Sequence, residues 1–124
     1  RTMVLNNIVY LLNSFLSCSI YQHVIFCWVM HDQSVIDSIL QRLSRDDCLT
    51  YAVSLLCGEK ELKGRLMKDV KSGLREENVI ARSLERLPLY EKLDTYKIDT
   101  SFLTEEQTAE CILRLAGNWD QGLL

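Results

Sequence analysis

The feature that most constrains the fold is the alternation of short strand-like runs with amphipathic helix patterns. The run at 24–29, with the sequence VIFCWV, is continuously apolar and rich in β-branched and aromatic residues. Such a run is typical of a strand that is buried on both faces of a parallel sheet. Further strands are predicted at 49–56 and, as a short strand or extended loop, at 97–100. Strands that alternate with helices indicate an α/β fold, a parallel sheet with helices on both faces.

Five helices are predicted from apolar residues that recur at helical spacing, at about 5–16, 34–45, 59–70, 76–87 and 104–115. Capping boxes are expected where Ser34 is followed by Asp37 and where Thr104 is followed by Gln107. Pro88 is expected to end the fourth helix, because proline lacks the N–H that a helix interior requires. One proline and five glycines leave little material for linkers, so we expect a single α/β domain over 1–124.

Residues 2–31 contain no aspartate, glutamate, lysine or arginine, and a stretch of that length is long enough to cross a bilayer. Asparagine, serine, glutamine and histidine interrupt it and divide it into two shorter pieces. We therefore interpret it as two buried elements and expect no contact with a membrane.

The cysteines indicate a reducing compartment. The chain has five cysteines, which are widely spaced and form no C-x-x-C motif. This pattern favours reduced thiols in the cytoplasm over a disulfide framework. Only two histidines accompany them, so no metal site is expected.

The charge balance argues against a nucleic-acid partner. The net charge is −3 and aromatic residues make up 8% of the chain. Single strands of RNA are held by aromatic stacking as well as by charge, so RNA contact along 63–86 is the weakest interpretation.

A local cluster of basic residues nevertheless stands out. Segment 63–75 holds five basic residues and one acidic residue. Arg75, Arg82 and Arg86 stand seven and four residues apart, so on one continuous helix they would share a narrow stripe. Guanidinium groups bind phosphate in bidentate fashion, which suits the stripe to a phosphate-rich ligand. In the alternative interpretation the stripe is a solvated helix face with salt bridges to Glu76, Glu77 and Glu85.

Polar residues follow each predicted strand. Ligands of open parallel sheets bind beyond the carboxyl ends of the strands, a rule that selects 30–32, 57–59 and 99–101. At the first of these, His31 would accept a proton or bind a substrate hydroxyl, and Asp32 would act as a base or hold a hydrated metal ion. In the alternative, Asp32 or Ser34 only caps the next helix.

Four segments, in their order and spacing, resemble the later part of small P-loop kinases of the nucleotide-kinase, shikimate-kinase and gluconate-kinase type. They are VIFCWVMHDQSVIDSIL, LTYAVSLLCGEKELKGRL, SGLREENVIARSLERLPLY and LDTYKIDTSFLTEEQTAECI. They correspond in turn to an inner strand with a substrate-side helix, a strand leading into the lid, the lid with its returning helix, and the last strand with its adenine loop and C-terminal helix. The resemblance covers 24–112, roughly three quarters of the chain, and is more specifically to uncharacterised bacterial ATP-binding relatives.

The resemblance implies a P-loop nucleoside triphosphate hydrolase-like kinase fold with a lid at about 59–87. It implies a protein that binds ATP with Mg²⁺ and moves a γ-phosphoryl group to a small-molecule acceptor. Arg65 would take the catalytic lid position, whose guanidinium neutralises the transferring phosphates. The other residues that the resemblance assigns are Arg75 and Arg82 in the lid or on the acceptor side, His31 and Asp32 facing the acceptor, and Asp99, Thr100 and Ser101 beside the adenine.

The sequence departs from the family at its front. The family begins with a strand, a Walker A loop and a helix, and no G-x-x-x-x-G-K-[ST] occurs here. We therefore expect the fold to be incomplete at the N-terminus and this portion alone to be inactive. Its partner would be the missing N-terminal part or a second copy. The alternative function is a non-enzymatic interaction or dimerisation domain whose basic stripe binds an acidic partner.

Overall fold

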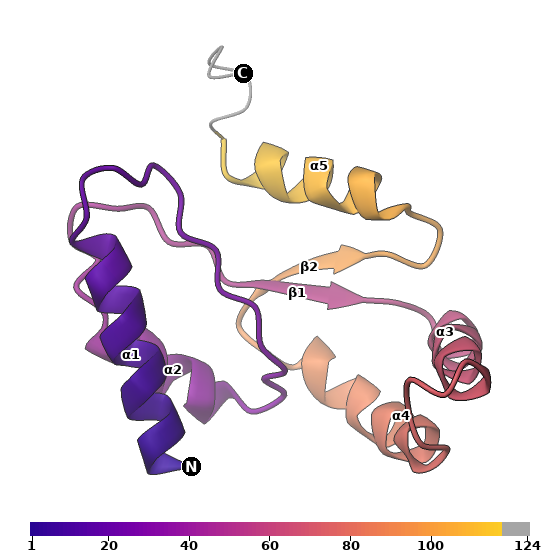
Figure 1. Ribbon diagram of the computed structural model, residues 1–124. Coiled ribbons are helices and arrows are strands. Elements are labelled where there is room, and N and C mark those ends of the chain that lie inside the picture. Colours follow the sequence, from indigo (N-terminus) through magenta and orange to yellow (C-terminus); the bar gives the residue numbers. More distant parts are fainter. Residues whose placement is uncertain (118–124) are drawn as a thin grey trace. The chain divides into compact units, whose positions relative to one another are not determined.

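Short strands separate groups of helices along the chain (Figure 1). The structure is a computed structural model that describes residues 1–117. Its elements are, in order, α1 (Thr2–Leu16), α2 (Gln33–Arg42), β1 (Val53–Leu56), α3 (Glu59–Lys71), α4 (Asn78–Glu91), β2 (Tyr96–Asp99) and α5 (Glu105–Leu115). The chain divides into two units, Arg1–Thr50 and a second unit that begins at Tyr51. A single domain over 1–124 stays a prediction, and residues 118–124 of that range lie outside the described residues.

The first unit is built from α1 and α2, whose apolar faces share a core. Leu12 of α1 packs with Val35 and Ile39 of α2, and Ile39 is only 4% exposed. Partly buried apolar side chains surround this cluster, namely Leu5, Ile8, Val24, Met30 and Leu43. The 3.6-residue periodicity that predicts the first helix is therefore confirmed as the pattern of a buried helix face.

The polar side of α1 holds the end of α2. The Asn13 amide donates to the carbonyl of Arg42 at 3.1 Å, and its oxygen accepts from the N–H of Ser44 at 2.8 Å. The Arg42 guanidinium in turn donates to the Asn6 oxygen at 2.7 Å. Because the last carbonyls of a helix lack intrahelical partners, the Asn13 amide supplies a donor that the end of α2 requires, while Asn6 holds the Arg42 side chain.

The start of α2 differs from the predicted capping box at Ser34 and Asp37. The N-cap is Asp32, whose carboxylate accepts from the N–H of Ser34 at 2.9 Å. Asp37 instead accepts from the Gln33 amide at 2.9 Å. Aspartate is among the best N-cap residues, because its carboxylate accepts from a free N–H of the first turn and its charge complements the helix dipole.

The predicted strand at 24–29 is wrong. The segment has no regular secondary structure, and the exposed fractions of Ile25 and Val29 are 86% and 66%. Val24 alone of this segment packs against the core of the unit. β-Branched and aromatic residues favour a strand only where a neighbouring strand and a covering layer are present, and residues 1–50 contain no strand.

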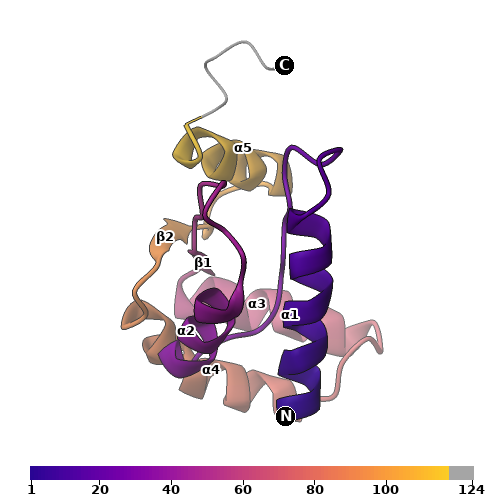
Figure 2. The same ribbon diagram turned by 90° about the vertical axis from the view of Figure 1, so that its left-hand side faces the viewer.

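The second unit contains a parallel pair of strands. β1 pairs with β2 in a register that sets Val53 opposite Tyr96 and Leu56 opposite Asp99. Figures 1 and 2 show α5 on one side of this pair and α4 on the other, with α3 beside α4. Mixed helices and a small parallel sheet agree with the predicted α/β class, although each strand has only four residues.

Helix α4 begins later and ends later than predicted. It starts at Asn78 and continues through Pro88 to Glu91. An interior proline costs a helix about 3 kcal/mol, so the helix must be held by packing, and Leu93, just past its end, is only 5% exposed. Arg75 precedes the helix, so the predicted stripe does not lie on one continuous helix.

The start of α5 confirms its predicted capping box. The Thr104 hydroxyl accepts from the N–H of Gln107 at 3.1 Å, and the Gln107 side chain accepts from the N–H of Thr104 at 2.9 Å. The helix also ends where predicted, because Gly117 has a positive φ of 71° that favours glycine.

The helices are short relative to a bilayer. The longest of those described, α1, has 15 residues, whereas a membrane span needs about 20. Within residues 1–117, no helix has both the length and the apolar character of a span.

Candidate functional site

The segments that follow β1 and β2 meet at the carboxyl edge of the strand pair. We call residues 57–58 and 99–101 the carboxyl rim. The Thr100 N–H and hydroxyl both donate to the carbonyl of Leu56, at 2.6 and 2.9 Å. The N–H of Gly58, at the start of α3, donates to the Ser101 hydroxyl at 2.8 Å. The polar groups at this edge therefore bind one another across the two strand ends.

Arg65 of α3 joins the carboxyl rim. Its guanidinium donates to the Thr100 hydroxyl at 3.1 Å and to the Thr100 carbonyl at 2.6 Å. The structure thus brings together a predicted lid residue and a predicted adenine-loop residue. These bonds use only part of the five donors of a guanidinium, and Arg65 is exposed, so the remaining donors are accessible to an anion.

Asp99 and Ser101 form a closed turn within the carboxyl rim. One Asp99 carboxylate oxygen accepts from the N–H and the hydroxyl of Ser101, at 2.9 and 2.6 Å. These hydrogen bonds, with a smaller contribution from the charge of Arg65, lower the pKa of Asp99 below its usual 3.8. Asp99 is therefore an acceptor that stays ionised, not a general acid at neutral pH.

We predict that Ser101→Ala raises the pKa of Asp99 toward 3.8, because it removes the hydroxyl that contributes most to the shift. In the native chain the ionised Asp99 stabilises the fold above pH 3.8, and this contribution is lost as the pH falls through the lowered pKa. The pKa of Asp99 in the native chain and in the variant is measured by following its carboxyl resonance by NMR as a function of pH. Ser101→Thr, which keeps a hydroxyl, is the control; an Asp99 midpoint that is the same in all three proteins contradicts the assignment.

Cys57 lies beside these groups as a neutral thiol. Burial raises its pKa above the usual 9.0, and the charges of Asp99 and Glu61 raise it further against the opposing effect of Arg65. A thiol in this state is a poor nucleophile at neutral pH. The carboxyl rim is accordingly suited to binding and positioning rather than to covalent catalysis by Cys57.

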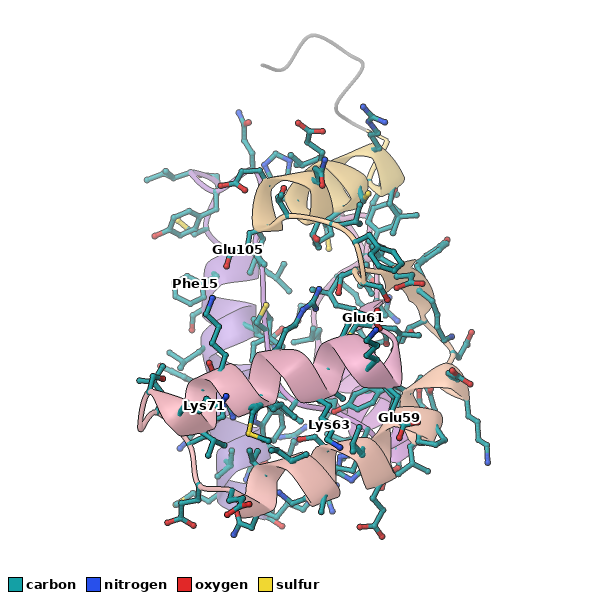
Figure 3. The ribbon with its side chains drawn as sticks, turned by 90° about the vertical axis from the view of Figure 1, so that its right-hand side faces the viewer. Phe15, Glu59, Glu61, Lys63, Lys71 and Glu105 are labelled. Atoms are coloured by element: carbon teal, nitrogen blue, oxygen red, sulfur yellow. The ribbon has the colours of Figure 1, made fainter. Side chains whose placement is uncertain are left out.

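Glu61 covers the first turn of α3. A Cβ placed on Gly58 would collide with the Glu61 carboxylate, so the absence of a side chain at Gly58 lets that carboxylate lie over the helix start. Figure 3 shows Glu61 on the side of α3 opposite to Glu59 and Lys63. A carboxylate near a helix N-terminus is favoured by the helix dipole.

A second cluster lies at the turn between α3 and α4. An open cleft of about 230 Å³, here called the arginine cleft, is lined by Arg75, Glu76, Asn78, Val79 and Arg82. The Arg75 Nε donates to the Asp69 carboxylate at 3.1 Å. This is the one ion pair formed within residues 1–117, so Arg82, which lines the cleft together with Glu76, is not ion-paired there.

The alternative interpretation of the basic stripe, a solvated helix face, is therefore wrong in the salt bridges that it expects. No ion pair with Glu76, Glu77 or Glu85 is formed in the described part of the chain. Arg86, which the pattern places with Arg75 and Arg82, does not line the arginine cleft. Asn78 lines it instead; it stands four residues before Arg82 on α4, a helical spacing that would have identified it from the sequence.

His31 and Asp32 lie in the first unit. Asp32 caps α2, which confirms one of the two interpretations of this residue. Hydrogen bonds from the side chain and backbone of Ser34 lower its pKa below 3.8. His31 is partly buried. That these two residues face an acceptor stays a prediction.

The described residues contain no group of three histidine, cysteine, aspartate or glutamate side chains placed to hold a metal ion. No protein-family model, curated protein or solved structure matches this chain.

Proposed function

We propose that this chain is the nucleotide-binding part of a P-loop kinase-like phosphotransferase, in which the arginine cleft binds phosphate groups of ATP. The observation that carries the proposal is the placement of Arg75, Arg82 and Asn78 on one cleft. Glu76 lines the same cleft, but Arg82 forms no ion pair with it or with any other residue of 1–117. A guanidinium that is not neutralised by the protein is suited to a phosphate, which it binds through charge-assisted hydrogen bonds. The cleft volume of about 230 Å³ suits one phosphoryl group rather than a whole nucleotide.

The order of the elements supports the same proposal. The α3 and α4 helices connect β1 to β2, so the arginine cleft lies in the connection between two parallel strands. Ligands of parallel sheets bind beyond the strand ends, where the carboxyl rim holds Arg65. A helical lid that carries arginines and returns to the strand pair agrees with the resemblance to small P-loop kinases.

In phosphoryl transfer the protein mainly positions the phosphates and neutralises the charge that spreads over them. Arg75 and Arg82 would do this in the arginine cleft, and the remaining donors of Arg65 would do it at the carboxyl rim. Mg²⁺ would enter with ATP, held largely by phosphate oxygens and water, as is usual for this ion. The Walker A motif is not in this sequence, so we assign binding to this chain and γ-phosphoryl transfer to a small-molecule acceptor only to a protein that supplies the motif. Its five free cysteines suit the cytoplasm.

We predict that Arg82→Gln weakens the binding of Mg-ATP and of inorganic tripolyphosphate to this chain about tenfold, because one charge-assisted contact is lost. Isothermal titration calorimetry measures both ligands. The exposed Arg82 forms no ion pair within residues 1–117, so the fold, checked by circular dichroism, is expected to be unchanged.

Arg114→Gln is the matched control, since it removes the same charge from the last turn of α5 and Arg114 does not line the arginine cleft. Equal losses in the two variants would show that only net charge matters and would contradict the site. Failure of the native chain to bind either ligand would overturn the proposed function. Binding of an acidic peptide in preference to tripolyphosphate would overturn it in favour of an interaction domain.

A further inference from the structure

The apolar segment at 24–29 has the side-chain arrangement of a strand, although it forms none. Ile25 and Val29 are 86% and 66% exposed. Phe26 and Trp28, at the alternate positions, are only 37% and 44% exposed. Their rings lie 6.4 Å apart, close to the spacing of second neighbours along an extended chain. The segment therefore has a more exposed and a less exposed side that alternate with the period of a strand.

The backbone of this segment offers free hydrogen-bonding groups. Within residues 1–117, no backbone–backbone hydrogen bond is formed by residues 24–29. None of the six is proline, so each keeps an N–H donor and a carbonyl acceptor. A run of six β-forming residues without charge, proline or glycine is the composition that pairs with another strand through a free edge. Residues 2–31 also carry no charge that would repel a like segment.

We infer that segment 24–29 pairs antiparallel with segment 24–29 of a second copy of this chain and joins the two copies as a dimer. A second copy supplies what the segment lacks, namely another uncharged apolar strand with free N–H and carbonyl groups. Antiparallel pairing is slightly more stable per residue than parallel pairing. Two identical segments paired in this way are related by a two-fold axis, which gives a closed dimer. The interface uses no residue of the arginine cleft or the carboxyl rim, so it does not depend on the proposed function.

The side chains favour one register for this pair, in which Cys27 lies opposite Cys27 of the second copy. This register sets Ile25 opposite Val29, so β-branched residues meet on the more exposed side. It sets Phe26 opposite Trp28, so aromatic rings meet on the other side. A shift by one residue would set Phe26 opposite Cys27 and mix the two sides.

Paired charges at Ile25 and Val29 test the register, because both side chains are exposed and tolerate charge in the single chain. Ile25→Lys with Val29→Lys sets like charges opposite each other at both ends of the pair, and we expect the dimer dissociation constant to rise at least about tenfold. Ile25→Lys with Val29→Glu sets opposite charges there, and we expect the dissociation constant to stay within about threefold of the native value. Within one chain the two positions are about 13 Å apart along the segment, so retained association reports contact between copies. Sedimentation equilibrium of the full chain over a concentration series measures the constant.

Ile20→Lys with Leu49→Lys is the matched control for the added charge. It places the same two charges at apolar positions that are 82% and 74% exposed and lie outside segment 24–29. We expect this variant to dimerise like the native chain.

Oxidation of Cys27 gives a second readout of the register. Opposite residues of an antiparallel pair have Cα atoms about 4.5–5.5 Å apart, within the range of a disulfide. The oxidant diamide takes up the two hydrogens that two thiols release, so it is expected to link two native copies through Cys27. Cys27→Ser is expected to abolish the linked dimer on a non-reducing gel, whereas Cys48→Ser, which removes another exposed thiol, is expected to keep it.

Three results would overturn the inference. The first is a native chain that stays monomeric at about 1 mM. The second is a dimer that both charged segment variants dissociate equally, because a parallel pair would set each new charge opposite its own copy. The third is a dimer that neither variant weakens, or one whose disulfide survives Cys27→Ser, since its interface would then lie elsewhere in the chain.

Discussion

Ile39→Ala is expected to lower the free energy of unfolding by about 2–5 kcal/mol, the usual cost of truncating a buried isoleucine. Ile39 is the least exposed residue of the core between α1 and α2, at 4%, and it packs with Leu12 and Val35. Alanine would leave a cavity there that the two helices can close only in part. Chemical denaturation followed by circular dichroism measures the loss.

Two further variants make this result specific. Ile39→Val removes one methylene and is expected to cost only about 0.5–1.5 kcal/mol. Ile25→Ala, in the segment that the sequence predicts as a buried strand, is expected to cost almost nothing because Ile25 is 86% exposed. If Ile25→Ala were as destabilising as Ile39→Ala, segment 24–29 would be buried, contrary to the 86% exposed fraction of Ile25.

Helices were predictable from the sequence because their determinants are local. The spacing of apolar residues identified the helix that became α1, and Thr104 with Gln107 identified the start of α5. Each of these features acts within one or two helical turns. Two details differ from the prediction. Asp32 and not Ser34 caps α2, because both residues are good caps and stand two positions apart. Helix α4 continues through Pro88, and the burial of Leu93 indicates that packing offsets the cost of the proline.

Strands were less predictable because pairing depends on residues far along the chain. β1 pairs with a strand whose partner residues lie 43 positions later in the sequence, such as Tyr96 opposite Val53. The more strongly apolar run at 24–29 forms no strand. Composition therefore shows that a segment is able to pair, whereas a partner in register decides whether it does.

The candidate site was predictable in its residue types but not in its contacts. The basic cluster was visible in the sequence, yet Arg65 and Arg82 have different surroundings. The Arg65 guanidinium binds a backbone carbonyl and a hydroxyl 35 residues away, whereas Arg82 lines an open cleft. The Arg65–Thr100 contact cannot be predicted from the spacing of residues in the sequence. It depends on how α3 lies against the loop that follows β2.

That contact predicts a large effect from the loss of one hydroxyl. Thr100→Val is expected to lower the free energy of unfolding by about 1–3 kcal/mol, because valine keeps the shape of threonine but removes two hydrogen bonds, one of them from a charged guanidinium. Thr100 is 8% exposed, and its hydroxyl donates to Leu56 and accepts from Arg65. Thr50→Val, at an exposed position, is the control and should cost little.

A double-mutant cycle with Arg65→Met then measures the contact itself. Arg65→Met keeps much of the apolar stem and removes the guanidinium, so its cost reports the bonds to Thr100 at 3.1 and 2.6 Å. We expect the two substitutions to be less destabilising together than their separate costs predict, by about 0.5–1.5 kcal/mol, since each removes the same hydroxyl contact. Strict additivity would mean that the contact between the Arg65 guanidinium and the Thr100 hydroxyl contributes nothing to stability in solution.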